Sequence, residues 1–102
     1  MTRTVWIHYA RPRTRWYLLD PADRLEHLRH RLEVDQESAA VGGRRQGSFH
    51  IRGQSDFATV EIWTFPDVDA AFAHWAAKVD AGYAHWFAFA NNVGAEVTDG
   101  PT

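Results

Sequence analysis

The sequence contains no cysteine, so neither a disulfide framework nor a thiolate metal site is possible. It also lacks an apolar run approaching the roughly 20 residues of a membrane-spanning helix, and its first residues lack the charged-then-apolar order of a secretory signal. The net charge of −2 argues against general nucleic-acid binding. From these absences we expect a soluble, cytoplasmic protein with neither a nucleic-acid nor a membrane partner.

Aromatic residues, in contrast, are abundant. Five Trp, three Tyr and six Phe occur in 102 residues, and a core of this size needs only part of that surface. The remainder must lie in a pocket or an interface. We expect one domain over residues 1–94 and a C-terminal tail over residues 95–102, where two glycines and a proline favour a loosely held chain.

Residues 56–66 predict the longest and most central strand, because β-branched and aromatic types dominate them and a proline closes them. Read at a period of two, both faces of this strand are apolar, and Glu61 is the acidic exception on one of them. Residues 4–10 repeat the pattern, with His8 among apolar neighbours. A strand that is apolar on both faces needs a cover on each.

The other elements follow from local signals. Asp20 and Pro21 begin a helix that fades over residues 35–40, and a glycine-rich turn over residues 42–47 precedes a short strand at 48–52. A second helix follows Asp67 and ends at Gly82, and residues 83–92 form the last strand, with a helical turn at its entry as the alternative. The buried stripe expected for the second helix consists of Val68, Phe72, Trp75 and Val79.

This order of elements predicts a ferredoxin-like βαββαβ fold of the α+β class, with a four-stranded antiparallel sheet and two helices on one face. The uncovered apolar face then predicts a homodimer in which two sheets pack together, as in the dimeric α+β barrels.

The chemistry of the side chains indicates which residues can form a site. A histidine or a carboxylate in apolar surroundings can move protons near neutral pH, and aromatic walls with few polar groups build small-molecule pockets. The catalytic candidates are His8, His50, Glu61, His85 and Asn91. The substrate-binding candidates are Trp6, Trp16, Tyr17, Trp63, Trp75, Trp86 and Arg52.

Each candidate also has a purely structural interpretation. His8 can be a core histidine with a satisfied nitrogen, and Glu61 can pair with Arg52 or another arginine. His74 can be a boundary residue that touches solvent, although it or His85 can also ligate haem iron. His27 and His30 are spaced like a ligand pair, but no third ligand stands at a telling distance, so we expect no metal site.

Three segments also carry a resemblance to known proteins. They are Trp16 with Asp20-Pro21-Ala22-Asp23-Arg24, the strand from Asp56 to Trp63, and Gly82-Tyr83 with Trp86-Phe87 and Asn91-Asn92-Val93-Gly94. Together they resemble small bacterial domains, including the darcynin-like ones, near the dimeric α+β barrel superfamily. That resemblance implies a group that includes cofactor-independent antibiotic-biosynthesis monooxygenases, polyketide cyclases, stress-response barrels and haem-degrading enzymes, so it does not select one chemistry.

Three functions remain open from the sequence. The first is a small enzyme without a cofactor that oxygenates or cyclises an aromatic or polyketide-like molecule in bacterial secondary metabolism. The second is a binding or stress-response barrel that holds a ligand without transforming it. The third is a haem-binding barrel.

Overall fold

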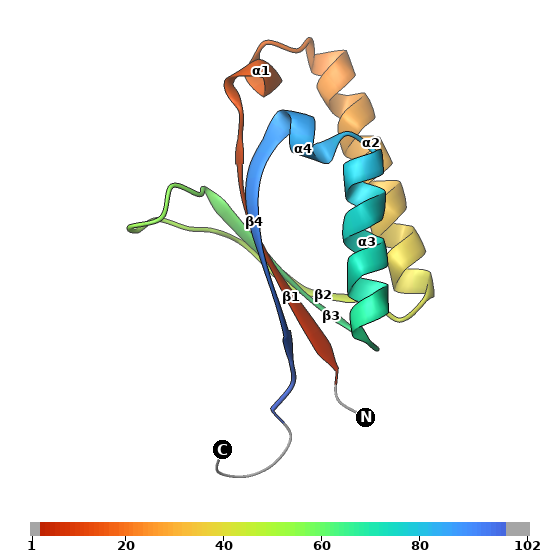
Figure 1. Cartoon of the computed structure of the whole chain (residues 1–102). Helices are drawn as coiled ribbons and strands as arrows, with labels where there is room; N and C mark the ends of the chain where they lie inside the picture. Colours follow the sequence, from red (N-terminus) through yellow and green to blue (C-terminus); the bar gives the residue numbers. More distant parts are fainter. Residues whose placement is uncertain (1–2, 98–102) are drawn as a thin grey trace.

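The computed structural model describes residues 3–97 and contains a four-stranded antiparallel sheet in the order β2-β3-β1-β4. The elements follow in the order β1 (Thr4–Pro12), α1 (Thr14–Tyr17), α2 (Pro21–Ala40), β2 (Arg44–His50), β3 (Thr59–Phe65), α3 (Val68–Asp80), α4 (Tyr83–Trp86) and β4 (Phe87–Ala95). The two long helices, α2 and α3, lie on one face of the sheet (Figure 1). This confirms the predicted ferredoxin-like α+β fold.

The register of β1 decides which side chains face the helices. Trp6, His8 and Ala10 are buried on the helix side, whereas the residues between them are only half-buried. His8 lies opposite Glu61 on β3 and opposite Asn91 on β4, so these three side chains share the helix-covered face. Glu61 therefore does not lie on a face left for a second subunit, because two-residue periodicity places it with Trp63.

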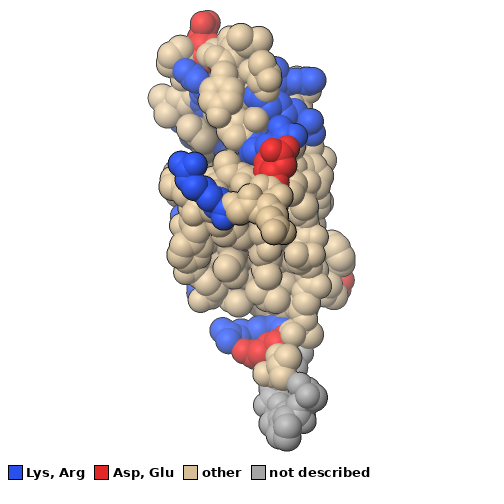
Figure 2. Space-filling view, turned by 90° about the vertical axis from the view of Figure 1, so that its left-hand side faces the viewer, with Lys and Arg blue, Asp and Glu red and all other residues tan. Residues whose placement is uncertain are grey.

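The opposite face of the sheet is not covered by any element among residues 3–97. Figure 2 looks onto this face and shows a broad area of uncharged side chains, with most charged ones toward the margins. The register assigns to it Val5, Ile7, Tyr9, Val60, Ile62, Thr64, Ala88 and Ala90.

Helix α3 contacts the sheet through a different stripe from the one that the sequence predicts. Ala71, His74 and Lys78 are buried, whereas Val68 and Phe72 are 44% and 58% exposed. The reason is volume: strands β1 and β3 already fill the space under the helix with large aromatic rings. A small residue such as Ala71 lets the helix approach those rings closely, and a larger one would not fit.

Several boundaries also differ from those predicted. Helix α2 continues to Ala40 instead of fading, and β2 begins at Arg44, inside the stretch expected to be a turn. Strand β3 starts at Thr59 and has seven residues, fewer than the nine of β1 and of β4, so it is not the longest. The last predicted strand is entered by the helical turn α4, which is the alternative expected there. Strand β4 follows this turn and extends to Ala95. Residues 98–102 of the expected tail lie outside the described residues.

The segment after β1 folds back over the core. Trp16 on α1 is 8% exposed and packs against Phe87 at the start of β4, with ring centroids 4.8 Å apart. Its neighbour Tyr17 is 63% exposed and takes no part in this packing. Across residues 3–97, no helix has the length and apolar character to span a membrane.

Candidate functional site: a groove between helix α2 and strands β2 and β3

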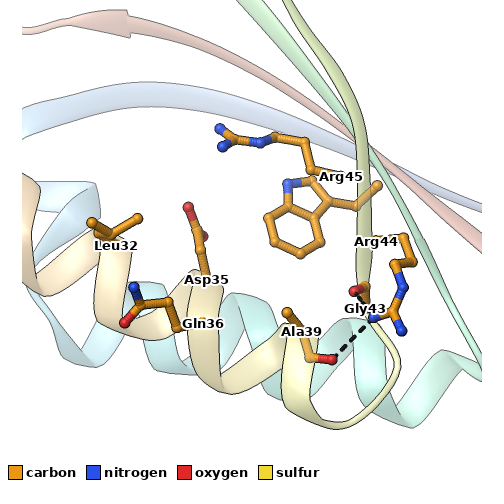
Figure 3. Close-up of a pocket in the computed structure, with 8 residues that line it drawn as sticks. Leu32, Asp35, Gln36, Ala39, Gly43, Arg44 and Arg45 are labelled. Atoms are coloured by element: carbon orange, nitrogen blue, oxygen red, sulfur yellow. Dashed lines mark hydrogen bonds between the residues drawn. The ribbon is translucent and has the colours of Figure 1, made fainter.

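Helix α2 and the strands β2 and β3 enclose a groove made of two adjoining cavities of about 260 and 280 Å³. Leu32, Asp35 and Arg45 line both cavities. Figure 3 shows Asp35 reaching into the groove from α2 and Arg45 reaching into it from β2. The remaining lining residues are Leu28, Arg31, Gln36, Ala39, Gly43, Arg44, Glu61 and Trp63.

At the base of the groove, the indole ring of a tryptophan is hydrogen-bonded to a carboxylate. Trp63 Nε1 donates a hydrogen bond to Glu61 Oε1 at 2.5 Å, and both side chains project from β3 toward α2. This bond fixes the edge of the indole and holds the carboxylate beside Arg31 and Arg45, which line the same cavity. The groove thus combines leucine side chains and the buried Trp63 indole with three cations and two carboxylates.

Arg52 takes no part in this arrangement. It lies in the loop after β2 and lines a separate cavity of about 410 Å³, together with Asp56 and Phe57. Within one chain Arg52 does not pair with Glu61, because β2 ends at His50 and Arg52 lines the other cavity, whereas the alternative partner, another arginine, is present in Arg31 and Arg45 beside Glu61.

Behind the groove lies a buried polar cluster. Lys78 Nζ is 2.6 Å from Asp35 Oδ1, and Lys78 is only 4% exposed. Burial lowers the pKa of Lys78, and the hydrogen bond and charge of Asp35 oppose this effect. Asp35 therefore has two roles, since it lines the groove on one side and holds a buried ammonium on the other.

His74 lies in the same cluster and is fully enclosed. Its Nδ1 is 2.5 Å from Ser38 Oγ, and its Nε2 is 4.0 Å from Asp35 Oδ1 without a hydrogen-bond partner. Burial lowers the pKa of His74 to about 4, and the Lys78 charge adds to this effect, so the ring is neutral at pH 7. The prediction that His74 touches solvent is wrong, because α3 turns this residue toward the aromatic rings of the sheet.

A second buried network surrounds His8. Its Nδ1 is 2.6 Å from Asn91 Oδ1, and its Nε2 is 2.6 Å from Tyr83 Oη. Because the Asn91 oxygen can only accept, Nδ1 carries the proton and Nε2 accepts from the Tyr83 hydroxyl. Burial lowers the pKa of His8 and raises that of Tyr83, so both groups are neutral at pH 7.

The structure brings together some of the predicted site residues and separates others. His8, Asn91 and Glu61 share one face, but His50 is exposed at the end of β2. His85 is exposed on α4, where both ring nitrogens lie within 3.3 Å of the Arg15 guanidinium.

Most of the predicted aromatic walls belong to the core. Trp63 lines the groove but is only 3% exposed and belongs with Trp6 to one buried cluster, and Trp16 is buried in the other. Trp75 is half-buried between those clusters, and Trp86 packs against the second of them. Aromatic abundance therefore reports mainly on packing in this small domain.

Sequence reasoning missed several residues of the two networks. The sequence gives no signal that Lys78 is buried, because the only lysine of an amphipathic helix rarely faces the sheet. Tyr83 directly follows the helix-ending Gly82, whose φ of +88° redirects the chain. The sequence did not indicate a role for Arg45, because β2 was expected to begin later. It did not indicate one for Asp35 or Ser38, because α2 was expected to end earlier. Among residues 3–97, no cluster of His, Asp or Glu is arranged to hold a metal ion.

Comparisons with known proteins give a likeness of fold. No model of a known protein family and no curated protein matches this chain. A mutant chlorite dismutase from Candidatus Nitrospira defluvii in complex with cyanide is 12% identical with a TM-score of 0.77, over 98% of this chain and 41% of that one. A putative chlorite dismutase is 21% identical with a TM-score of 0.69, over 84% of this chain and 39% of that one.

A conserved protein of unknown function from Bacteroides thetaiotaomicron, described as a possible oxidoreductase, is 11% identical with a TM-score of 0.57, and the match covers 93% of this chain and 98% of that one. This chain thus spans about two fifths of the chlorite dismutase chains. At these identities the likeness concerns the fold alone, and it agrees with the ferredoxin-like α+β fold expected from the sequence. The closer resemblance to monooxygenase or darcynin-like domains stays a prediction.

Proposed function

We propose that this protein is an oxidoreductase-type barrel domain that binds a flat, carboxylate-bearing ligand of the haem class in the groove between α2 and β3. The observation that carries the proposal is the make-up of the groove itself. Leu28 and Leu32 offer apolar contact and Arg31 and Arg45 offer charge for carboxylates, while the Trp63 indole, which is only 3% exposed, closes the base of the groove.

Each of these contacts has a chemical match in such a ligand. A planar apolar ring system packs on leucine side chains, and arginine forms paired hydrogen bonds with carboxylates. The structural neighbours support the redox class. One is a chlorite dismutase in complex with cyanide, which is a strong ligand of haem iron, and another is described as a possible oxidoreductase.

The groove suits the face and the carboxylates of a porphyrin, but the chain does not present an iron ligand in it. None of the residues that line the two cavities is a histidine. His74 Nε2 is enclosed behind Asp35. His85 lies on α4 and contacts Arg15 of α1. The residues present therefore do not fit axial ligation, and the proposal concerns binding of the flat anion without a step at iron.

Titration with hemin and with metal-free protoporphyrin IX tests this proposal. We expect both to bind, because the contacts are to the ring and its carboxylates. Arg45→Ala should weaken both by roughly 10- to 100-fold, the effect of losing a charge-assisted hydrogen bond. Arg52→Ala is the matched control, since it removes the same side chain from the other cavity, and it should leave the affinity unchanged.

Other outcomes would replace the proposal. Binding of hemin without binding of protoporphyrin would show that iron ligation dominates, which the enclosed His74 does not provide. Failure of both tetrapyrroles together with binding of a polycyclic aromatic acid would favour the cofactor-independent monooxygenase or cyclase. Equal losses in Arg45→Ala and Arg52→Ala would show that the arginines attract the ligand only by overall charge.

We also propose that a second copy of the chain covers the open face of the sheet. The half-buried side chains of Ile7, Tyr9 and Ile62 lie there, and an apolar sheet face is stable only when it is packed against another layer. Sedimentation equilibrium at micromolar concentration tests this, with a dimer as the expected result and a well-folded monomer as the contrary one.

A further inference from the structure

The network around His8 has the arrangement of a proton-coupled redox pair. The Tyr83 hydroxyl donates to His8 Nε2 at 2.6 Å, and His8 Nδ1 donates to Asn91 Oδ1 at 2.6 Å. Tyr83 and His8 are 4% and 5% exposed, so bulk water does not compete for either bond. The proposed binding of a ligand in the groove uses none of these three side chains.

Aromatic rings connect this pair to the floor of the groove. Trp63 and Trp6 are direct partners across β3 and β1, and the His74 ring lies 4.6 Å from one and 5.0 Å from the other. Trp6 is 6.1 Å from Trp75, which is 5.8 Å from Tyr83. Three tryptophans, Trp63, Trp6 and Trp75, therefore lie between the groove and Tyr83, and the His74 ring bridges the first two.

We propose that Tyr83 is a redox-active tyrosine whose proton is taken up by His8. A one-electron oxidant removes an electron from the Tyr83 phenol, and the phenolic proton moves from Oη to His8 Nε2. The products are a neutral tyrosyl radical and an imidazolium, while the oxidant is reduced by one electron. Return of an electron to Tyr83 brings the proton back to Oη, so the cycle is balanced.

The groups around Tyr83 favour transfer of the phenolic proton to His8 over its retention on the oxidised Tyr83. The Arg31 guanidinium lies over the Tyr83 ring at 4.7 Å, so a tyrosine radical cation would have a positive charge directly above it. A phenol radical cation is a strong acid, and His8 is the hydrogen-bonded base next to it. The carbonyl oxygen of Asn91 then stabilises the imidazolium through the bond from Nδ1.

Flash photolysis tests the proposal with photogenerated ruthenium(III) tris-bipyridine, an outer-sphere one-electron oxidant that needs no ligand in the groove. We expect a long-lived tyrosyl signal in electron paramagnetic resonance at neutral pH. Tyr83→Phe should abolish it, and Tyr17→Phe should keep it, because Tyr17 is exposed and is a matched loss of one hydroxyl. His8→Gln accepts a hydrogen bond but cannot take the proton, and it should slow radical formation by about 100-fold.

A spectroscopic measurement on the unmodified protein makes the test independent of whether the variants fold. In D₂O, electron–nuclear double resonance of the radical should detect one strongly coupled exchangeable deuteron, placed between Tyr83 and His8. The proposal is overturned if the wild-type radical lacks that deuteron, if no long-lived tyrosyl radical forms, or if Tyr83→Phe retains the signal. These results do not depend on tetrapyrrole binding, so the two proposals fail separately.

Discussion

Acid should destabilise this protein through His74, and the structure sets the size of the effect. The ring is fully buried with a pKa of about 4, whereas an unfolded histidine titrates near 6.5. Between these values the unfolded chain binds more protons than the native one, so stability falls as the pH drops from 6.5 to 4 and is flat below that range. A difference of this size corresponds to about 3 kcal/mol of unfolding free energy.

Urea unfolding at fixed protein concentration, at pH 7 and at pH 4, measures the effect. In His74→Gln the amide can still bond to Ser38 but cannot be protonated, so the variant should lose about 3 kcal/mol less than the wild type over this interval. His50→Gln is the control, since it removes an exposed imidazole and should leave the pH dependence as it is. Parallel curves for the wild type and His74→Gln would refute the reasoning.

Three further predictions concern the packing of the molecule. Lys78→Ala should destabilise the fold by about 3–5 kcal/mol in urea unfolding, because it leaves Asp35 without its buried partner, and adding Asp35→Leu should recover part of that loss. Ala71→Leu should cost about 1–3 kcal/mol by overpacking the helix against the sheet, and an unchanged midpoint would contradict the close approach of α3. Ile62→Glu should convert a dimer into a monomer in sedimentation, and persistence of the dimer would exclude the open face as its interface.

Much of the fold is predictable from local chemistry. The strand around Ile62 and the helix begun by Asp20 and Pro21 follow from β-branched runs and from start signals that act within a few residues. The faces of the helices are not predictable in the same way. Both the stripe with Phe72 and the stripe with His74 are periodic, and only the volume of the tryptophans opposite decides which is buried.

The residues of the candidate site are likewise predictable in part from the sequence. His8 is predicted as a polar residue among apolar neighbours and Asn91 as a polar residue near the end of the last strand, and strand register brings the two into contact. Glu61 was selected for the same reason and lines the groove. Arg45 could not be assigned, because it sits before a β-bulge in a strand that was expected to begin later, and a one-residue shift moves a side chain to the other face.

The most direct measurement of the central claim is the response of the Trp63 indole to a ligand. A nitrogen–proton NMR spectrum should contain five indole signals, and the Trp63 signal can be assigned with Trp63→Phe. On addition of metal-free protoporphyrin IX, we predict that the Trp63 signal shifts while that of Trp16, buried at the other end of the core, stays in place. A saturated complex in which the Trp63 signal does not move would contradict binding in the groove.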